Sequence, residues 1–148
     1  MPTTPTSCPL VNFRHHTPIQ IRFNDIDLLG HVNNTLYFVY MDLAKPRYFQ
    51  AVLGDKFEWG TIGLVIVNTN CDFCQPTFID DNIEVVTAVT SIGDKSLTLE
   101  QQVVSRDDGS LRAHCRTIMV GFDPATNSSM PITNMWREAL AKYEGREF

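Results

Sequence analysis

The sequence predicts an α+β domain in which one antiparallel sheet of about five strands curls around a long central helix, and a short helix closes the chain. Three observations predict this fold. A strand-like alternation precedes one long apolar helix, four more strand-like runs follow it, and two links between those runs have hairpin composition. With 148 residues and 43% hydrophobic side chains, the chain suits one globular domain.

The N-terminal residues 1–17 are expected to form a tail. They are rich in Pro, Thr and Ser and show no sustained periodicity, so we expect His15 and His16 to be solvated there. From residue 18 the pattern changes, because apolar residues at 19, 21 and 23 alternate with polar ones. This alternation predicts the first strand, and residues 18–148 are expected to form a single domain.

The central helix is predicted over residues 33 to about 50. Asn33 or Asn34 would cap its N-terminus. Its apolar residues lie on every face of a helical wheel, so the sheet should cover the helix nearly all round. Pro46 has no N–H to donate to the carbonyl of Asp42, and we expect it to kink or end the helix.

The remaining strands follow a loop at residues 54–63. Glycine-containing turns at 93–96 and 107–110 predict that the last three strands form an antiparallel meander. A five-stranded sheet of this kind has edges, and pairing with a second copy would protect one of them. We therefore expect a homodimer or homotetramer. The strand-like runs are residues 64–74, 83–92, 97–104 and 111–122.

The closing helix is predicted to begin at Pro131 and Thr133. One face of this helix is apolar. Its residues are Met135, Trp136, Ala139, Leu140 and Tyr143.

Charge and composition exclude several classes of function. The formal net charge is −5, which offers no general attraction for nucleic acid or anionic lipid. No window approaches a membrane span, and the first residues lack a basic region followed by an apolar one, so we expect a cytoplasmic protein. Four cysteines are few for a secreted disulfide scaffold, which favours reduced thiols.

The densest group of reactive side chains spans residues 25–34, between the first strand and the central helix. A calcium loop of the EF-hand type is excluded, because its fifth and twelfth positions would be Leu29 and Leu36. What remains is a carboxylate, Asp27, and an imidazole, His31, beside a helix N-terminus. Backbone N–H groups there could stabilise the oxyanion formed when Asp27, or a water that it holds, attacks an acyl carbonyl.

On composition alone, the same residues also fit a plain loop with a capped helix. A family resemblance favours the chemical interpretation. Residues 22–37, which include Asp27 followed three residues later by Gly-His-Val-Asn-Asn, resemble the signature of hotdog-fold acyl thioesterases of the 4-hydroxybenzoyl-CoA and acyl-ACP thioesterase group. Residues 68–76 with Asp80 and Asp81, and residues 92–96, resemble later parts of that family, so the resemblance covers about 18–143.

The resemblance implies a function and a role for each matching residue. The family's catalytic carboxylate falls on Asp27, as nucleophile or general base, and its carbonyl-polarising backbone amide falls on Asn34. His31 and Asn33 would give polar support, and Asp25 matches an acidic position of supporting role. The implied activity is hydrolysis of acyl-CoA, or of acyl-ACP, to a free acid and a thiol, with no metal or redox cofactor required.

Two features leave the catalytic assignment open. The plant acyl-ACP enzymes have an Asn two residues after the carboxylate, where this chain has Leu29, and another subgroup carries its carboxylate on the central helix, which makes Asp42 an alternative. A hydratase or dehydratase of acyl thioesters, and a non-catalytic acyl-thioester binding module, are alternative functions.

Tyr37, Lys95 and Ser96 are assigned to substrate binding. Lys95 and Ser96 lie in a hairpin where the family resemblance is clear, and Arg112 and Arg116 are further cations for coenzyme A phosphates. His114 and Cys115 are interpreted as structural strand residues. Cys71 and Cys74 have the spacing of half a zinc knuckle, but no second pair follows, so we expect no metal site.

Overall fold

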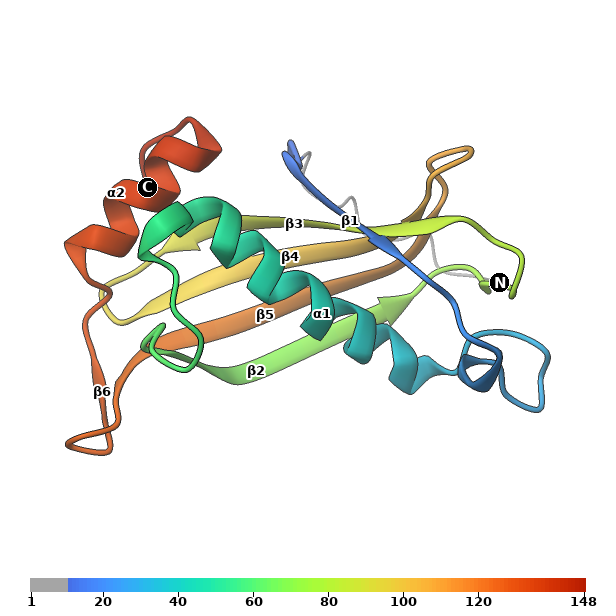
Figure 1. Cartoon of the computed structure of the whole chain (residues 1–148), viewed down its shortest axis with the longest axis horizontal. Coiled ribbons are helices and arrows are strands. Elements are labelled where there is room, and N and C mark those ends of the chain that lie inside the picture. The colour runs from blue at the N-terminus through green and yellow to red at the C-terminus, as the bar shows by residue number, and fades with distance from the viewer. Residues whose placement is uncertain (1–10) are drawn as a thin grey trace.

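The computed structural model describes residues 11–148, in which one antiparallel sheet curls around the long helix α1 (Asn34–Leu53) (Figure 1). The sheet order is β1-β3-β4-β5-β2, with β6 paired to β5. This arrangement confirms the predicted architecture, including the β3-β4-β5 meander, and adds the short strand β6 that the sequence pattern did not predict. The strands are β1 (His15–Ile19), β2 (Leu64–Phe73), β3 (Ile83–Ile92), β4 (Ser96–Ser105), β5 (Leu111–Asp123) and β6 (Ser128–Met130).

The first strand lies earlier in the chain than predicted. β1 begins at His15 and ends at Ile19, antiparallel to β3, so it starts inside the segment expected to be a tail. The alternation to residue 23 does not continue as a strand, because the chain turns into the 3₁₀ helix η1 (Phe23–Asp25) and leaves the Phe23 side chain exposed. The part of the expected tail before residue 11 lies outside the described residues.

Helix α1 begins where the sequence predicts and runs further. Asn33 is the N-cap, and its side chain accepts a hydrogen bond from the Thr35 N–H. Pro46 lies inside the helix and does not end it. Packing explains the continuation, because Lys45, Tyr48 and other residues around the proline are buried and hold both halves of the helix on the sheet.

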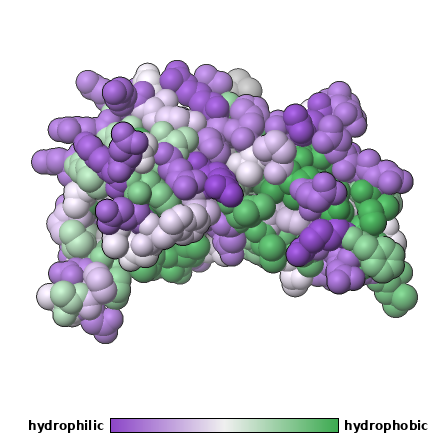
Figure 2. Space-filling model, in the orientation of Figure 1, coloured by the Kyte–Doolittle hydropathy of each residue, from purple (hydrophilic) through white to green (hydrophobic). Residues whose placement is uncertain are grey.

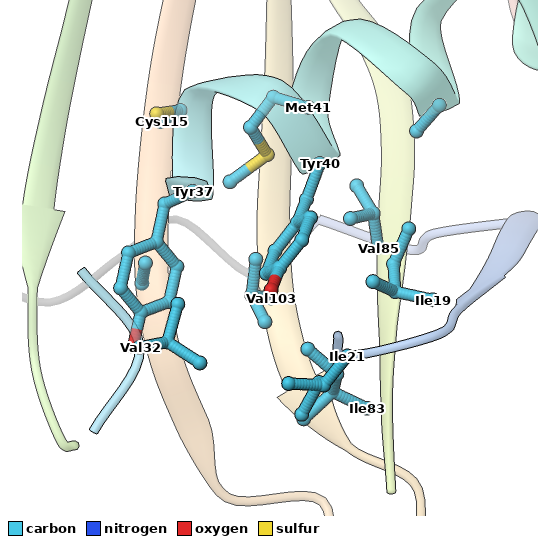
Figure 3. Packing of buried hydrophobic residues seen from close by; sticks show 12 residues of the cluster. Ile19, Ile21, Val32, Tyr37, Tyr40, Met41, Ile83, Val85, Val103 and Cys115 are labelled. Carbon is cyan, nitrogen blue, oxygen red and sulfur yellow. The ribbon is translucent and has the colours of Figure 1, made fainter. Parts of the chain in front are cut away.

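One side of α1 is not covered by the sheet. Val39 and Leu43 are 49% and 48% exposed, although the sequence pattern predicted a helix buried nearly all round. On the other side, Tyr37, Tyr40 and Met41 point from α1 into the sheet (Figure 3). The buried Gln101 on β4 donates to the Met41 carbonyl at 3.0 Å, which adds a polar contact between the helix and the strands beneath it.

The C-terminal helix α2 (Asn134–Glu144) begins after its N-cap Thr133 and packs beside the end of α1 (Figure 1). Of the residues on its predicted apolar face, Trp136 and Leu140 are buried, whereas Met135 is exposed. The second 3₁₀ helix, η2 (Gly54–Lys56), follows α1 directly. Among residues 11–148, no helix has the length and apolar character that crossing a membrane requires.

A buried polar contact joins α2 to α1 and β3. The Tyr48 hydroxyl donates to Glu144 Oε1 at 2.6 Å and accepts from the Val89 N–H at 3.0 Å. The His15 ring packs edge-on against Tyr48 at 5.6 Å between ring centroids, so His15 is not the solvated side chain that the sequence predicted. The neighbouring His16 bonds Glu84 across the sheet at 2.9 Å.

Replacing Tyr48 with Phe should destabilise the fold by about 2 kcal/mol, because the Val89 N–H and the Glu144 carboxyl each lose a buried hydrogen-bond partner. Urea unfolding measures the change. Tyr143→Phe is the matched control, since no hydrogen bond to the Tyr143 hydroxyl is found among the described residues. Equal stability of the two variants would contradict the structural role of this contact.

Candidate functional site

The loop between η1 and α1 folds back on itself around Asp27. Ile26 and Val32 form an isolated antiparallel bridge across it. Inside this bridge, the Asp27 N–H donates to the His31 carbonyl at 3.1 Å, and the Gly30 N–H donates to the Asp27 carbonyl at 3.0 Å. Gly30 has a φ of 84°, which a residue without a Cβ adopts readily. The turn therefore holds the Asp27 backbone on both sides.

The Asp27 carboxylate is held by two hydrogen bonds. The Leu29 N–H donates to Oδ1 at 2.9 Å, and the Asn33 Nδ2 donates to Oδ2 at 3.1 Å. The other end of the same Asn33 amide, Oδ1, accepts from the Thr35 N–H at 2.9 Å as the cap of α1. A single side chain thus ties the carboxylate to the N-terminus of the central helix.

A pocket of about 260 Å³ opens beside this helix N-terminus. Asn34 is the first residue of α1, where backbone N–H groups have no acceptor within the helix and the helix dipole is positive. Asp27 and Asn33 do not line the pocket. They lie next to it, because Asn33 precedes Asn34 in the chain and its side chain binds the Asp27 carboxylate. The lining residues are His31, Val32, Asn34, Tyr37, Phe73, Cys74, Gln75 and Pro76.

Asp25 anchors the loop to the core. It is 1% exposed, and its Oδ2 accepts from the Tyr40 hydroxyl at 2.7 Å and from the Arg22 N–H at 3.1 Å. The Asp25 carbonyl also accepts from the Asn33 N–H at 2.9 Å. Burial alone would raise the pKa of Asp25, but the hydrogen bonds from Tyr40 and Arg22, with the Arg22 charge, hold that pKa below its ordinary value.

A second ion pair supports the far wall of the pocket. Arg112 on β5 donates to Asp81 Oδ2 at 2.6 Å and to the Pro76 carbonyl at 2.8 Å, and the Thr77 carbonyl accepts from the Val32 N–H. Burial would raise the pKa of Asp81, but hydrogen bonds from the Phe78 N–H and Arg112 lower it. Arg112 is therefore already engaged in holding residues 76–81, although the sequence suggested it as a phosphate-binding cation.

His31 faces the pocket and not the carboxylate. Its ring meets Phe78 edge-on with centroids 6.2 Å apart, and only its backbone carbonyl bonds Asp27 among the described contacts. Around the loop, Leu28 and Leu29 are exposed. Figure 2 shows apolar surface at the right-hand end of the molecule, the end at which Figure 1 draws the loop before α1.

The structure separates Lys95 and Ser96 from the other predicted site residues. They lie at the β3–β4 hairpin, where the Lys95 carbonyl accepts from the Gly121 N–H. Asp27 lies near the opposite end of the sheet, and the ten residues of β4 (Ser96–Ser105) span about 30 Å between the two ends. One chain therefore does not bring Lys95 and Asp27 to a common site.

The alternative carboxylate, Asp42, projects from the third turn of α1. It bonds Lys45 at 2.8 Å, with the Asp42 side chain 67% exposed. Arg116 pairs with the buried Glu100 on the face of the sheet away from α1. Within residues 11–148, no three His, Cys, Asp or Glu side chains gather as a metal site would require.

The family model of the thioesterase-like superfamily matches residues 21–140. The chain belongs to this superfamily. The match spans the Asp27 loop, the central helix and the meander, so the hotdog fold that the sequence resemblance implied is confirmed.

Individual superfamily members resemble the chain over most of its length. The long-chain acyl-CoA thioesterase FadM of Escherichia coli is 27% identical over 127 residues, which cover 84% of this chain and 95% of that protein. The acyl-CoA thioester hydrolase YbgC of Escherichia coli is 22% identical over 114 residues, covering 72% and 81%. A Thermus thermophilus thioesterase, crystallised with coenzyme A and zinc, superposes with a TM-score of 0.81 at 30% identity and covers 92% and 98%.

The supporting residues of this superfamily member were less visible in its sequence than the Asp27 cluster. Tyr40 is one of many aromatic residues in an apolar helix, and no periodicity distinguishes a tyrosine that binds Asp25 from one that only fills the core. The supporting roles of Thr77 and Arg112 depend on contacts between residues far apart in the chain, Thr77 with Val32 and Arg112 with Pro76. A single sequence does not reveal such contacts.

Acid should destabilise the protein in part through Asp25 and Asp81. Their pKa values are below the ordinary 3.8 in the folded state, so the unfolded chain takes up these protons first as pH falls. The stabilisation is complete above about pH 5 and is lost as pH falls through 3.8 toward the folded values. Glu144, whose pKa burial raises, contributes with the opposite sign.

Urea unfolding from neutral pH to about pH 3 tests this expectation. Asp25→Asn should lower stability at neutral pH and flatten the dependence on pH below about pH 5. Asp55→Asn, at an exposed carboxylate in η2, is the matched control and should keep the wild-type slope. An unchanged slope in Asp25→Asn would remove Asp25 as a source of acid sensitivity.

Proposed function

We propose that the protein is an acyl-CoA thioesterase that hydrolyses its substrate at the Asp27 loop. The observation that carries the proposal is the double role of Asn33, which holds the Asp27 carboxylate with Nδ2 and caps α1 with Oδ1. A carboxylate and a helix N-terminus are thereby fixed next to each other beside a pocket. The family membership and the names of FadM and YbgC support the substrate class.

The proposed reaction uses both the Asp27 carboxylate and the N-terminus of α1. The thioester carbonyl oxygen would lie at the Asn34 N–H, where the helix N-terminus stabilises the negative charge of the tetrahedral intermediate. Asp27 then acts as nucleophile, through an anhydride that water hydrolyses, or as the base that takes a proton from the attacking water. In both routes the carbon–sulfur bond breaks and the thiol leaves with a proton.

Other residues would shape the site around this chemistry. Tyr37 and Phe73 line the pocket with their rings 5.5 Å apart and offer an apolar wall for the acyl group. His31 closes another side of the pocket, in contact with Phe78. An acyl carrier protein remains an alternative carrier of the acyl group, and a cytoplasmic location stays a prediction from the sequence.

The direct test is release of free thiol from a panel of acyl-CoA and acyl-ACP substrates. Asp27→Asn should reduce kcat at least about 100-fold, because it removes the acid–base or nucleophilic group. Asp42→Asn is the matched control on the rival carboxylate and should stay within about twofold of wild type. Single turnover in ¹⁸O-labelled water would place label in the Asp27 side chain only if Asp27 is the nucleophile.

Three outcomes would contradict the proposal. Full activity of Asp27→Asn, with loss of activity in Asp42→Asn, would indicate that Asp42 is the catalytic carboxylate. A change in the absorbance of an enoyl thioester without thiol release would indicate a hydratase or dehydratase. Saturable binding of acyl-CoA without turnover would indicate a binding module.

We also propose that the active form is at least a homodimer that covers the open side of α1 and the free edge of β2. β2 pairs with β5 on one side only in the described chain. Val65, Ile66 and Val67 on β2 are exposed, as are Val39 and Leu43 on α1. Exposed apolar side chains on an unpaired strand edge and on an uncovered helix are typical of subunit interfaces.

Light scattering after gel filtration tests the dimer. Leu43→Asp should shift the protein toward monomer, because it places a charge in the proposed apolar contact. Met135→Asp is the matched control at an exposed apolar residue of α2 and should leave the mass unchanged. A wild-type protein that is monomeric at micromolar concentration would contradict the proposal.

A further inference from the structure

We infer that Cys71 and Cys115 form a dithiol that a peroxide converts to an intramolecular disulfide between β2 and β5. The two residues are register partners across these strands. Cys115 is buried in the core beneath α1 (Figure 3). Cys71 is partly buried and packs against the same cluster, so both side chains lie on the face of the sheet toward α1. The inference does not rest on the thioesterase proposal, in which neither thiol has a role.

The backbone hydrogen bonds place this pair at a position suited to a disulfide. The Cys74 N–H donates to the Arg112 carbonyl at 2.8 Å, so Cys74 and Arg112 are a hydrogen-bonded pair. Such pairs alternate with non-hydrogen-bonded pairs along antiparallel strands, and Cys71–Cys115 is three steps further along the unbroken register. It is therefore a non-hydrogen-bonded pair.

The pairing of β5 with β4 leads independently to the conclusion that Cys71–Cys115 is a non-hydrogen-bonded pair. The Gly121 N–H donates to the Lys95 carbonyl, and counting six steps along the β4–β5 register makes Gln101–Cys115 a hydrogen-bonded pair. Because Cys115 directs its N–H and carbonyl toward β4, it has none directed toward β2. Non-hydrogen-bonded pairs have Cα atoms about 4.5 Å apart, within the range that a disulfide spans.

The electrostatics around the pair favour a reactive thiolate. A hydrogen bond from the Cys71 thiol lowers the pKa of Cys115, against the effect of burial, and the Lys45 charge lowers it further. The same hydrogen bond raises the pKa of Cys71, and burial adds to that effect. Of the two thiols, Cys115 is thus the one whose surroundings favour the thiolate, which is the nucleophilic form of cysteine.

The oxidation balances with hydrogen peroxide as the two-electron oxidant. The Cys115 thiolate attacks one peroxide oxygen, so that a sulfur–oxygen bond forms, the oxygen–oxygen bond breaks and hydroxide leaves. The Cys71 sulfur then attacks the Cys115 sulfenic sulfur and expels the second hydroxide. The two thiol protons end in two waters, and the sulfur–sulfur bond joins β2 to β5.

Treatment of the full chain with excess hydrogen peroxide, then alkylation and peptide mapping, tests the inference. We expect a Cys71–Cys115 crosslink with a mass two hydrogens below that of the reduced protein. The thermal midpoint should rise by at least about 5 °C, since the bond closes a long loop, and dithiothreitol should reverse this rise. Cys71→Ser and Cys115→Ala should each abolish both effects.

Cys74→Ser is the matched control, because Cys74 lies three residues from Cys71 but outside the register pair, and this variant should keep the crosslink. Two results would overturn the inference. One is a wild-type protein whose Cys71 and Cys115 remain fully alkylated after peroxide treatment. The other is a map with a Cys71–Cys74 bond, or with only oxygen added to the thiols.

Discussion

The buried carboxylate of Asp25 is the contact on which the rest of the candidate site depends. A charge removed from water must be hydrogen-bonded, and Asp25 finds its partners on two elements, Tyr40 on α1 and Arg22 before η1. This requirement fixes the distance between the end of the first strand and the central helix. The Asp25 carbonyl then holds the Asn33 backbone, so the position of Asp27 follows from a residue that does not face the pocket.

The same dependence explains why the site stands at one end of the sheet. The Asp27 turn has few apolar contacts of its own, and its exposed leucines contribute nothing to the core of this chain. It is held by Asp25 from the helix side and by the Thr77 carbonyl from the β5 side, where Arg112 secures residues 76–81. Two ion pairs therefore position the Asp27 turn, together with the buried Val32 that anchors its end in the core.

Much of the fold could be predicted because its signals are local. The Asn33 cap, the hairpin turns and the alternation in β3 to β5 each depend on a few neighbouring residues. The sequence pattern mispredicted the elements whose bounds depend on contacts between distant residues. β1 begins earlier than predicted because it pairs with β3. α1 continues past Pro46 because both halves of the helix are packed. In the site, the Asp27 cluster was visible as a motif, but the partnership of Tyr40 with Asp25 was not.

The separation of Asp27 and Lys95 at opposite ends of the sheet has a consequence for two-fold assemblies. Phe73, beside the Asp27 pocket, and Leu64, beside the Lys95 hairpin, are the two ends of β2. Antiparallel pairing of β2 with its own copy would set the Phe73 end of one chain against the Leu64 end of the other. A site that used both ends would then be shared, so a chain defective at Asp27 and a chain defective at Lys95 would complement each other in a mixed dimer.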